Sequence, residues 1–283
     1  MFLQLMFDMP DWGSSGVWMG LLTLTFLEIV LGVDNIIFIS IAAGKLPPEL
    51  RKKATNIGLF LAMFMRILLL FGISVLIAMK EPWIEFHGEF ASAGFSGQSL
   101  ILIAGGIFLL YKSVTEIHHK LEQDNSNEHG VKGKSMTLSS AIVQITLINI
   151  VFSFDSILTA VGMTNGLDGA LVVMIISVVL SVIIMMMFAN PVGEFVNKHP
   201  TIQVLGLSFL ILIGFMLILE GAHLAQLTIL DSEVGIVPKG YLYFAIAFSL
   251  LVEALNIKMR KKSAPVQLHN AKEEEARMAL TQN

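Results

Sequence analysis

Three acidic side chains lie within long hydrophobic segments of this sequence. Glu28 and Asp34 fall in the first segment and Asp155 falls in the fourth. An ionised group within a bilayer is costly and is tolerated where it has a partner or a function. Carboxylate, amide and hydroxyl oxygens, in a chain without cysteine, favour hard cations such as Mg²⁺, Ca²⁺ and Mn²⁺. We predict one divalent-metal site near the middle of the membrane, with the ligands Glu28, Asp34, Asn35, Asn149, Asp155 and Ser156.

Arg66 is the only basic residue in the middle of a hydrophobic segment. We expect it either to occupy the carboxylate site when no ion is bound or to serve as a structural counter-ion. One arginine cannot neutralise three acids, so pairing alone does not account for all of them.

Further polar residues close the third and the sixth segments. A Glu-x-x-His spacing places both side chains on one helix face and can ligate a metal. We predict that these residues form stations where the ion enters and leaves, or proton relays, although ordinary interfacial residues explain the pattern equally well. They are Lys112, Glu116, His119, Glu220 and His223.

The elements that must position these residues are membrane-spanning helices. The chain has 283 residues, of which 55% are hydrophobic and 14% charged, whereas soluble domains carry about a quarter charged residues. Runs of roughly twenty apolar residues are long enough to cross a bilayer. The sequence therefore predicts an all-α polytopic membrane protein with seven transmembrane helices, at about 17–43, 55–79, 98–116, 138–163, 169–190, 203–220 and 240–257.

The basic residues predict how the chain is oriented. With the N-terminus outside and the C-terminus inside, 15 of the 18 Lys and Arg residues fall in cytoplasmic segments, as expected from the enrichment of positive charge on that side. The N-terminal segment has no positively charged region, so we expect no cleavable signal peptide.

Two internal matches indicate a repeat. The surroundings of Asp34 and Asp155 match without gaps, so that Glu28 aligns with Asn149, and the ends of the third and sixth segments match as well. Three spans in each copy require the second copy to enter from the opposite side, as in many secondary transporters. We predict two inverted three-helix repeats plus one extra helix. Gly32 favours an unwound first span, whereas Ser153 supports such a bend less well in the second copy.

The predicted regions follow from the spans and the repeat. They are a first three-helix repeat with an external N-terminus (1–118), a cytoplasmic linker (119–137), an inverted second repeat (138–225), an external loop with the seventh helix (226–262), and a cytoplasmic tail (263–283).

The acidic motifs resemble those of the TerC family of integral membrane proteins, named for an association with tellurium resistance. The resemblance rests on EIVLGVDNIIFI (28–39), AIVQITLINIVFSFDSILTAVGM (141–163), GEFVNKHP (193–200), LSFLILIGFMLILEGAH (207–223) and VPKGYLYFA (237–245). It implies metal-ion transport, above all manganese efflux, with Glu28, Asp34 and Asp155 in the site. The family often has an acid where this chain has Asn149. The sequence contains no counterpart of the cytoplasmic nucleotide-binding and transporter-associated domains that some members append.

These observations predict a bacterial cytoplasmic-membrane transporter that exports Mn²⁺ and is not an enzyme. We expect a divalent ion and the lipid bilayer as partners, no resident cofactor and no nucleic acid, and leave open a homo-oligomer or a membrane-protein partner. Two alternatives remain: a non-transporting partner that assists assembly or metal loading of secreted proteins, and an intramembrane metal-dependent enzyme. The enzyme would need several His ligands together, whereas His119 and His223 are predicted at opposite faces of the membrane.

Overall fold

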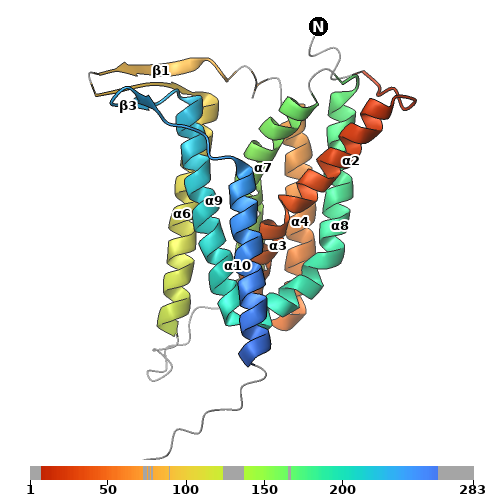
Figure 1. The fold of residues 1–283 in the computed structure, drawn as a ribbon. Coiled ribbons are helices and arrows are strands. Elements are labelled where there is room, and N and C mark those ends of the chain that lie inside the picture. Colours follow the sequence, from red (N-terminus) through yellow and green to blue (C-terminus); the bar gives the residue numbers. More distant parts are fainter. Residues whose placement is uncertain are drawn as a thin grey trace, which may run out of the picture. The chain divides into compact units, whose positions relative to one another are not determined.

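The structure of this protein is a computed structural model (Figure 1). It describes residues 8–72, 75, 77, 79–88, 90–123, 137–164 and 167–260. The predicted ligand side chain of Asp34, most of the predicted linker and the predicted tail lie outside the described residues and side chains. The chain divides into two compact units, Met1–Leu242 and Tyr243–Asn283, which are described separately.

Seven helical segments in the described part of the chain are long and apolar enough to cross a membrane, which confirms the predicted all-α polytopic class. The first segment contains two helices, and the last helix begins in the first unit and continues into the second. The helices are α2 (Ser15–Val30), α3 (Val33–Gly44), α4 (Pro48–Phe71), α6 (Gly97–Gln123), α7 (Leu138–Met163), α8 (Ala170–Lys198), α9 (Pro200–Leu224) and α10 (Lys239–Arg260).

The helix starts follow ordinary capping chemistry. The hydroxyl of Ser14 accepts a hydrogen bond from the backbone N–H of Gly16 at the start of α2, and the hydroxyl of Thr137 does the same for Ser140 in α7. Pro48 and Pro200 begin α4 and α9, where a missing N–H costs no helical hydrogen bond.

The first span is interrupted at Gly32, as the sequence predicted. Helix α2 ends at Val30 and α3 begins at Val33, whereas α7 continues through Ser153 without a break. A Cβ atom at Gly32 would lie 2.3 Å from Sδ of Met185 in α8. The absence of a side chain at Gly32 therefore permits the close approach of Met185 on α8.

Large apolar side chains are exposed on the outer faces of the helices. Phe26 is 68% exposed, Phe64 54% and Phe188 56%. Large contiguous apolar patches are rare on soluble monomers. Exposure of aromatic rings along helices that can cross a membrane is the pattern expected of lipid-facing surfaces.

A small four-stranded sheet, which the sequence analysis did not foresee, joins two distant loops. Its strands are β1 (Pro82–His87), β2 (Ala91–Ser96), β3 (Thr228–Ile229) and β4 (Ser232–Glu233), in the order β1-β2-β3-β4 with antiparallel neighbours. Because β2 leads into α6 and α9 leads into β3, both helices meet the sheet, α6 at its start and α9 at its end (Figure 1). Helices α6 and α9 therefore run antiparallel, and the loops before α6 and after α9 lie on one side.

Helix packing is reciprocal between the two halves of the chain. Helix α4 packs against α7, while α8 packs against α2 and α3, and α6 packs against α9. Small residues allow the last pair to approach closely: a Cβ at Gly106 would lie 2.5 Å from the carbonyl oxygen of Gly214. If α7, α8 and α9 repeat α2–α3, α4 and α6, each of these contacts has a counterpart in the other half.

Candidate ion-binding site

Glu28 and Arg66 form a buried ion pair between α2 and α4. Only 4% of Glu28 and 6% of Arg66 is exposed, and Nη1 of Arg66 donates a hydrogen bond to Oε2 of Glu28. Nε of Arg66 also donates to Oγ of Ser153 in α7, over 3.1 Å. The guanidinium thus links three helices, and its planar array of donors suits such a buried position.

A small cavity adjoins the Arg66 guanidinium. Its volume is about 10 Å³, which is enough for about one water molecule. Polar groups reach it from α4 and α7, and apolar ones from α4 and α8. The lining residues are Leu59, Ala62, Met63, Arg66, Asn149, Ser153, Val182 and Met185. The structure therefore brings two residues singled out in the sequence, Arg66 and Asn149, to one cavity.

The neutral residues proposed as ligands are buried and hydrogen-bonded along their own helices. Nδ2 of Asn149 donates to the carbonyl of Ile145 over 2.9 Å, and Oγ of Ser156 donates to the carbonyl of Ser153 over 3.2 Å. Asn35 is also buried, with Nδ2 3.5 Å from the carbonyl of Leu31. Asp34 lies in the first turn of α3, at the helix end whose dipole favours negative charge.

Asp155 belongs to a second charged cluster at the sheet-bearing end of the first unit. Nζ of Lys239, in the first turn of α10, donates to Oδ1 of Asp155 and, over 3.1 Å, to Oγ1 of Thr159. Oε2 of Glu220 in α9 is 3.8 Å from the same ammonium. Lys239 was not singled out from the sequence. It follows Pro238 at the border of an apolar span, where a basic residue gives no signal of a site.

The two Glu-x-x-His pairs do not act as units in the structure. Glu116 is buried and binds Nζ of Lys45 at 2.5 Å, whereas His119 is exposed. In the other pair, Nδ1 of His223 hydrogen-bonds with the carbonyl of Val234 at 3.1 Å, while Glu220 lies near Lys239. Lys112 is partly buried in α6. The role of these residues as stations or relays stays a prediction.

Among the side chains that the structure describes, no three His, Asp or Glu residues come together as a metal-binding group. Glu28 and Asp155 bind different cations, Arg66 and Lys239, so their described side chains belong to two charged clusters. Whether one site unites Glu28, Asp34 and Asp155 stays a prediction, and the side chain of Asp34 lies outside the described part.

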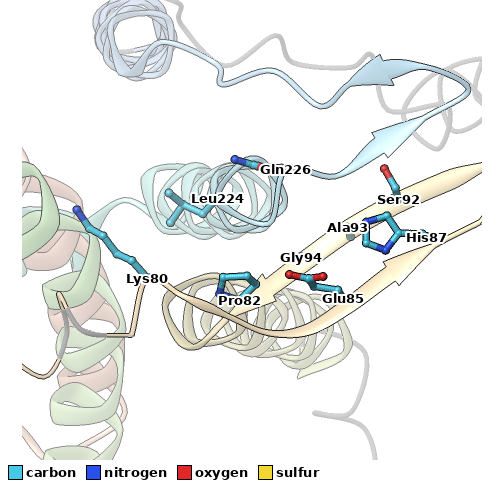
Figure 2. Close-up of a pocket in the computed structure, with 9 residues that line it drawn as sticks. All are labelled: Lys80, Pro82, Glu85, His87, Ser92, Ala93, Gly94, Leu224 and Gln226. Carbon is cyan, nitrogen blue, oxygen red and sulfur yellow. The ribbon is translucent and has the colours of Figure 1, made fainter.

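Two larger hollows lie at the ends of the bundle. One, of about 290 Å³, lies beside the α3–α4 turn and the part of α8 that follows Pro191, which cannot donate an intrahelical hydrogen bond. Arg51, Lys52 and Glu194 are among its lining residues. The other, of about 230 Å³, lies at the sheet; Figure 2 shows Lys80 at one end of it and Glu85, on β1, further along.

The fold and these buried charges define a polytopic membrane protein with ionised side chains between its helices. Residues 14–266 match the family described as "Integral membrane protein TerC family", and the chain belongs to this family.

Three of the curated relatives are from Escherichia coli strain K12. The chain is 43% identical to the inner membrane protein YgdQ over 246 residues, which cover 87% of this chain and 94% of YgdQ. It is 44% identical to the inner membrane protein YoaE over 241 residues, and 42% identical to YegH over 247 residues. These matches cover 85% and 87% of the chain but only 42% of YoaE and 43% of YegH. No solved structure is significantly similar.

The relatives' names and the seven potential spans agree on location. The protein is a multi-pass inner membrane protein, as predicted.

Proposed function

We propose that this protein is a secondary transporter that exports a divalent metal ion, with Mn²⁺ as its cargo, across the inner membrane. Glu28, Asp34 and Asp155 supply negative charge, and Asn35, Asn149 and Ser156 supply neutral oxygens. The site is exposed alternately to the two sides of the membrane.

The observation that carries this proposal is the way in which the buried acids are neutralised. Glu28 contacts the guanidinium of Arg66, and Asp155 contacts the ammonium of Lys239. In both cases a carboxylate within a span binds a cation on a long side chain, which can leave without a change of backbone. A metal ion can replace such a cation, because hard divalent ions prefer oxygen ligands of this type.

The packing of the helices supports alternating exposure. The reciprocal contacts and the antiparallel α6–α9 pair are those expected of two inverted repeats. In inverted-repeat transporters the site lies where the two copies meet, and one copy rocks against the other. The cavity beside Arg66 is lined by α4, α7 and α8, and would lie at such a boundary if α4 belongs to the first copy and α7 and α8 to the second.

The helix interruption supports an ion site in the first copy. Discontinuous helices place free backbone groups and helix dipoles at the binding sites of many transporters. Here the interruption at Leu31 and Gly32 lies between Glu28 and Asp34, so both acids flank irregular backbone. The second copy carries Ser153 and Asn149 instead on a continuous helix, which makes the two halves unequal.

The alternatives gain less support. An intramembrane metal enzyme would need clustered His ligands, whereas His119 lies near the end of α6 away from the sheet and His223 lies at the sheet end of α9. A non-transporting partner protein would not need acids paired with replaceable cations inside its spans. It makes a distinct prediction, because its function would survive neutralisation of those acids.

The test is Mn²⁺ flux in proteoliposomes, measured with the wild type, Asp34→Asn and Asp155→Asn at several pH gradients. We expect flux in the wild type and a loss of at least tenfold in each variant, because each removes one of the carboxylates proposed to hold the ion. A dependence on the pH gradient would identify protons as the counter-ion. Folded wild-type protein that carries no Mn²⁺, Mg²⁺ or Ca²⁺ would instead favour the non-transporting partner.

A further inference from the structure

We infer that Lys239 is a tethered substitute for the transported ion: its ammonium occupies the Asp155–Glu220 carboxylate pair until a divalent cation displaces it. This inference rests on the proposed function and assigns a specific role to a residue that the sequence analysis did not single out.

Oxygen atoms from two helices surround the ammonium group of Lys239. Its Nζ atom contacts Oδ1 of Asp155, lies 3.1 Å from Oγ1 of Thr159 and is 3.8 Å from Oε2 of Glu220. Three oxygen atoms from two helices thus surround one positive charge. Carboxylate and hydroxyl oxygens are also the ligands that a hard divalent cation takes.

A divalent ion balances the charge of the Asp155–Glu220 pair better than the Lys239 ammonium does. When Asp155 and Glu220 are both ionised, one ammonium leaves the cluster with one negative charge in excess, whereas one divalent ion makes it neutral. Since attraction scales with the charge of the bound ion, a divalent ion competes favourably with the ammonium for the same oxygens. The cluster is also largely shielded from solvent, with side-chain exposures of 15% for Asp155, 24% for Glu220 and 30% for Lys239.

Lys239 is placed so that its ammonium group can leave Asp155 and return to it. Asp155 lies eight residues before the end of α7 at Met163, or about 12 Å along the helix from its sheet-side end. Lys239 begins α10 directly after Pro238, and its four-carbon stem allows the ammonium to swing away. The lysine therefore reaches a carboxylate well inside a span from the segment that follows the sheet. It can return to the carboxylates when an ion leaves toward that side.

When no metal ion is bound, the Lys239 ammonium is therefore the cation that the carboxylates hold. Release of the ion toward the sheet-bearing end and return of the ammonium are two halves of one exchange. Without the amine, the ion has no competitor and is released slowly.

The first experiment measures the reactivity of the Lys239 amine in the full-length wild type. An amine-reactive ester is added in pulses at constant pH, and mass spectrometry follows the labelling rate of each lysine with and without Mn²⁺. We expect Mn²⁺ to raise the labelling rate of Lys239 at least fivefold, because the displaced amine is free to react. Lys80, which lines the hollow at the same end of the molecule, is the internal control and should change little (Figure 2).

A second measurement uses the variants Lys239→Gln and Lys239→Arg. For Lys239→Gln we expect about tenfold tighter Mn²⁺ binding and at least a fivefold lower maximal flux. Lys239→Arg keeps the charge and should remain closer to the wild type in affinity. The opposite changes in affinity and flux distinguish an ion competitor from a merely structural residue, whose loss would weaken both.

The outcomes separate the two proposals. Mn²⁺ flux in the wild type, together with unchanged Lys239 labelling and unchanged Mn²⁺ affinity in Lys239→Gln, would overturn the role of Lys239 and leave the transporter proposal intact. A wild type that neither binds nor carries a divalent ion would overturn both.

Discussion

At the scale of single residues, the Arg66 guanidinium neutralises the buried carboxylate of Glu28. Both side chains are almost fully buried, and Arg66 also donates to Ser153. In the predicted second copy Asn149 aligns with Glu28, and both Asn149 and Arg66 line one cavity. The first half thus contains a buried acid where the predicted second copy has an uncharged amide.

Removal of one partner of this pair should be more damaging than removal of both. We expect Glu28→Gln to destabilise the protein by about 3–5 kcal/mol, because it leaves the Arg66 guanidinium buried without a counter-charge. The double variant Glu28→Gln/Arg66→Met should recover most of that loss, because it leaves no unpaired charge buried. Unfolding in detergent, followed by loss of the monodisperse chromatographic peak, measures the difference. Equal stability of Glu28→Gln and the wild type would contradict a buried ion pair.

The same residues show how far the sequence alone leads. Glu28, Asp155 and Arg66 are identified by their charge within apolar runs, because such charges are costly in hydrocarbon. Which cation meets which acid depends on helix packing, and no sequence pattern connects Lys239 with Asp155 across 84 positions. The lysine lies at the border of its span, where a basic residue is unremarkable.

At the scale of elements, the α6–α9 pair depends on glycine. Gly106 and Gly214 allow the two backbones to approach so closely that a Cβ at either position would meet the carbonyl oxygen of the other, at 2.5 and 2.9 Å. Glycine at such contacts replaces side-chain packing by direct contact of the helices. Strand β2 precedes α6 and strand β3 follows α9. The distance between the two helices therefore determines whether β2 and β3 can pair.

Gly106→Ala should therefore destabilise the helix pair. A methyl group there meets backbone rather than a flexible side chain, so α9 must shift, at a cost of about 1–3 kcal/mol. Gly162→Ala in α7 is the matched control, because a Cβ at that position meets nothing within 4 Å and alanine favours helix. The measurement is the midpoint of thermal unfolding of the two variants in the same detergent. A Gly106→Ala midpoint equal to that of Gly162→Ala would show that α6 and α9 do not touch at this point.

Element prediction succeeded where the physical signal was strong and local. The spans follow from apolar length, and the interruption of the first span follows from Gly32 next to Asp34. The sheet was missed because β3 and β4 have two residues each, and β2 contains Gly94 and two serines. Such strands have little intrinsic preference for extended structure, so their pairing depends on the helices that bring the two loops together.

At the scale of the whole chain, the sheet limits the membrane topology. Pairing of β2 with β3 places the loop before α6 and the loop after α9 on one side of the membrane. An even number of spans must then separate the two loops. The helices α6, α7, α8 and α9 between them meet this requirement, with each crossing once. The sheet does not tell which side this is. The distribution of charge predicts the outer side, because 15 of 18 basic residues would be cytoplasmic with the N-terminus outside.

The orientation can be tested with single cysteines, because the natural chain has none. In intact cells we expect a membrane-impermeant maleimide to label Ser232→Cys, in the exposed strand β4, and to label Ser126→Cys in the predicted linker only after permeabilisation. Ser177→Cys, which is buried in α8, should stay unlabelled in both conditions and controls for unfolding. The reverse pattern would place the sheet and Lys239 in the cytoplasm. Release past Lys239 would then carry the ion inward, so the same labelling experiment also decides whether the proposed exchange at Asp155 is a step of export or of uptake.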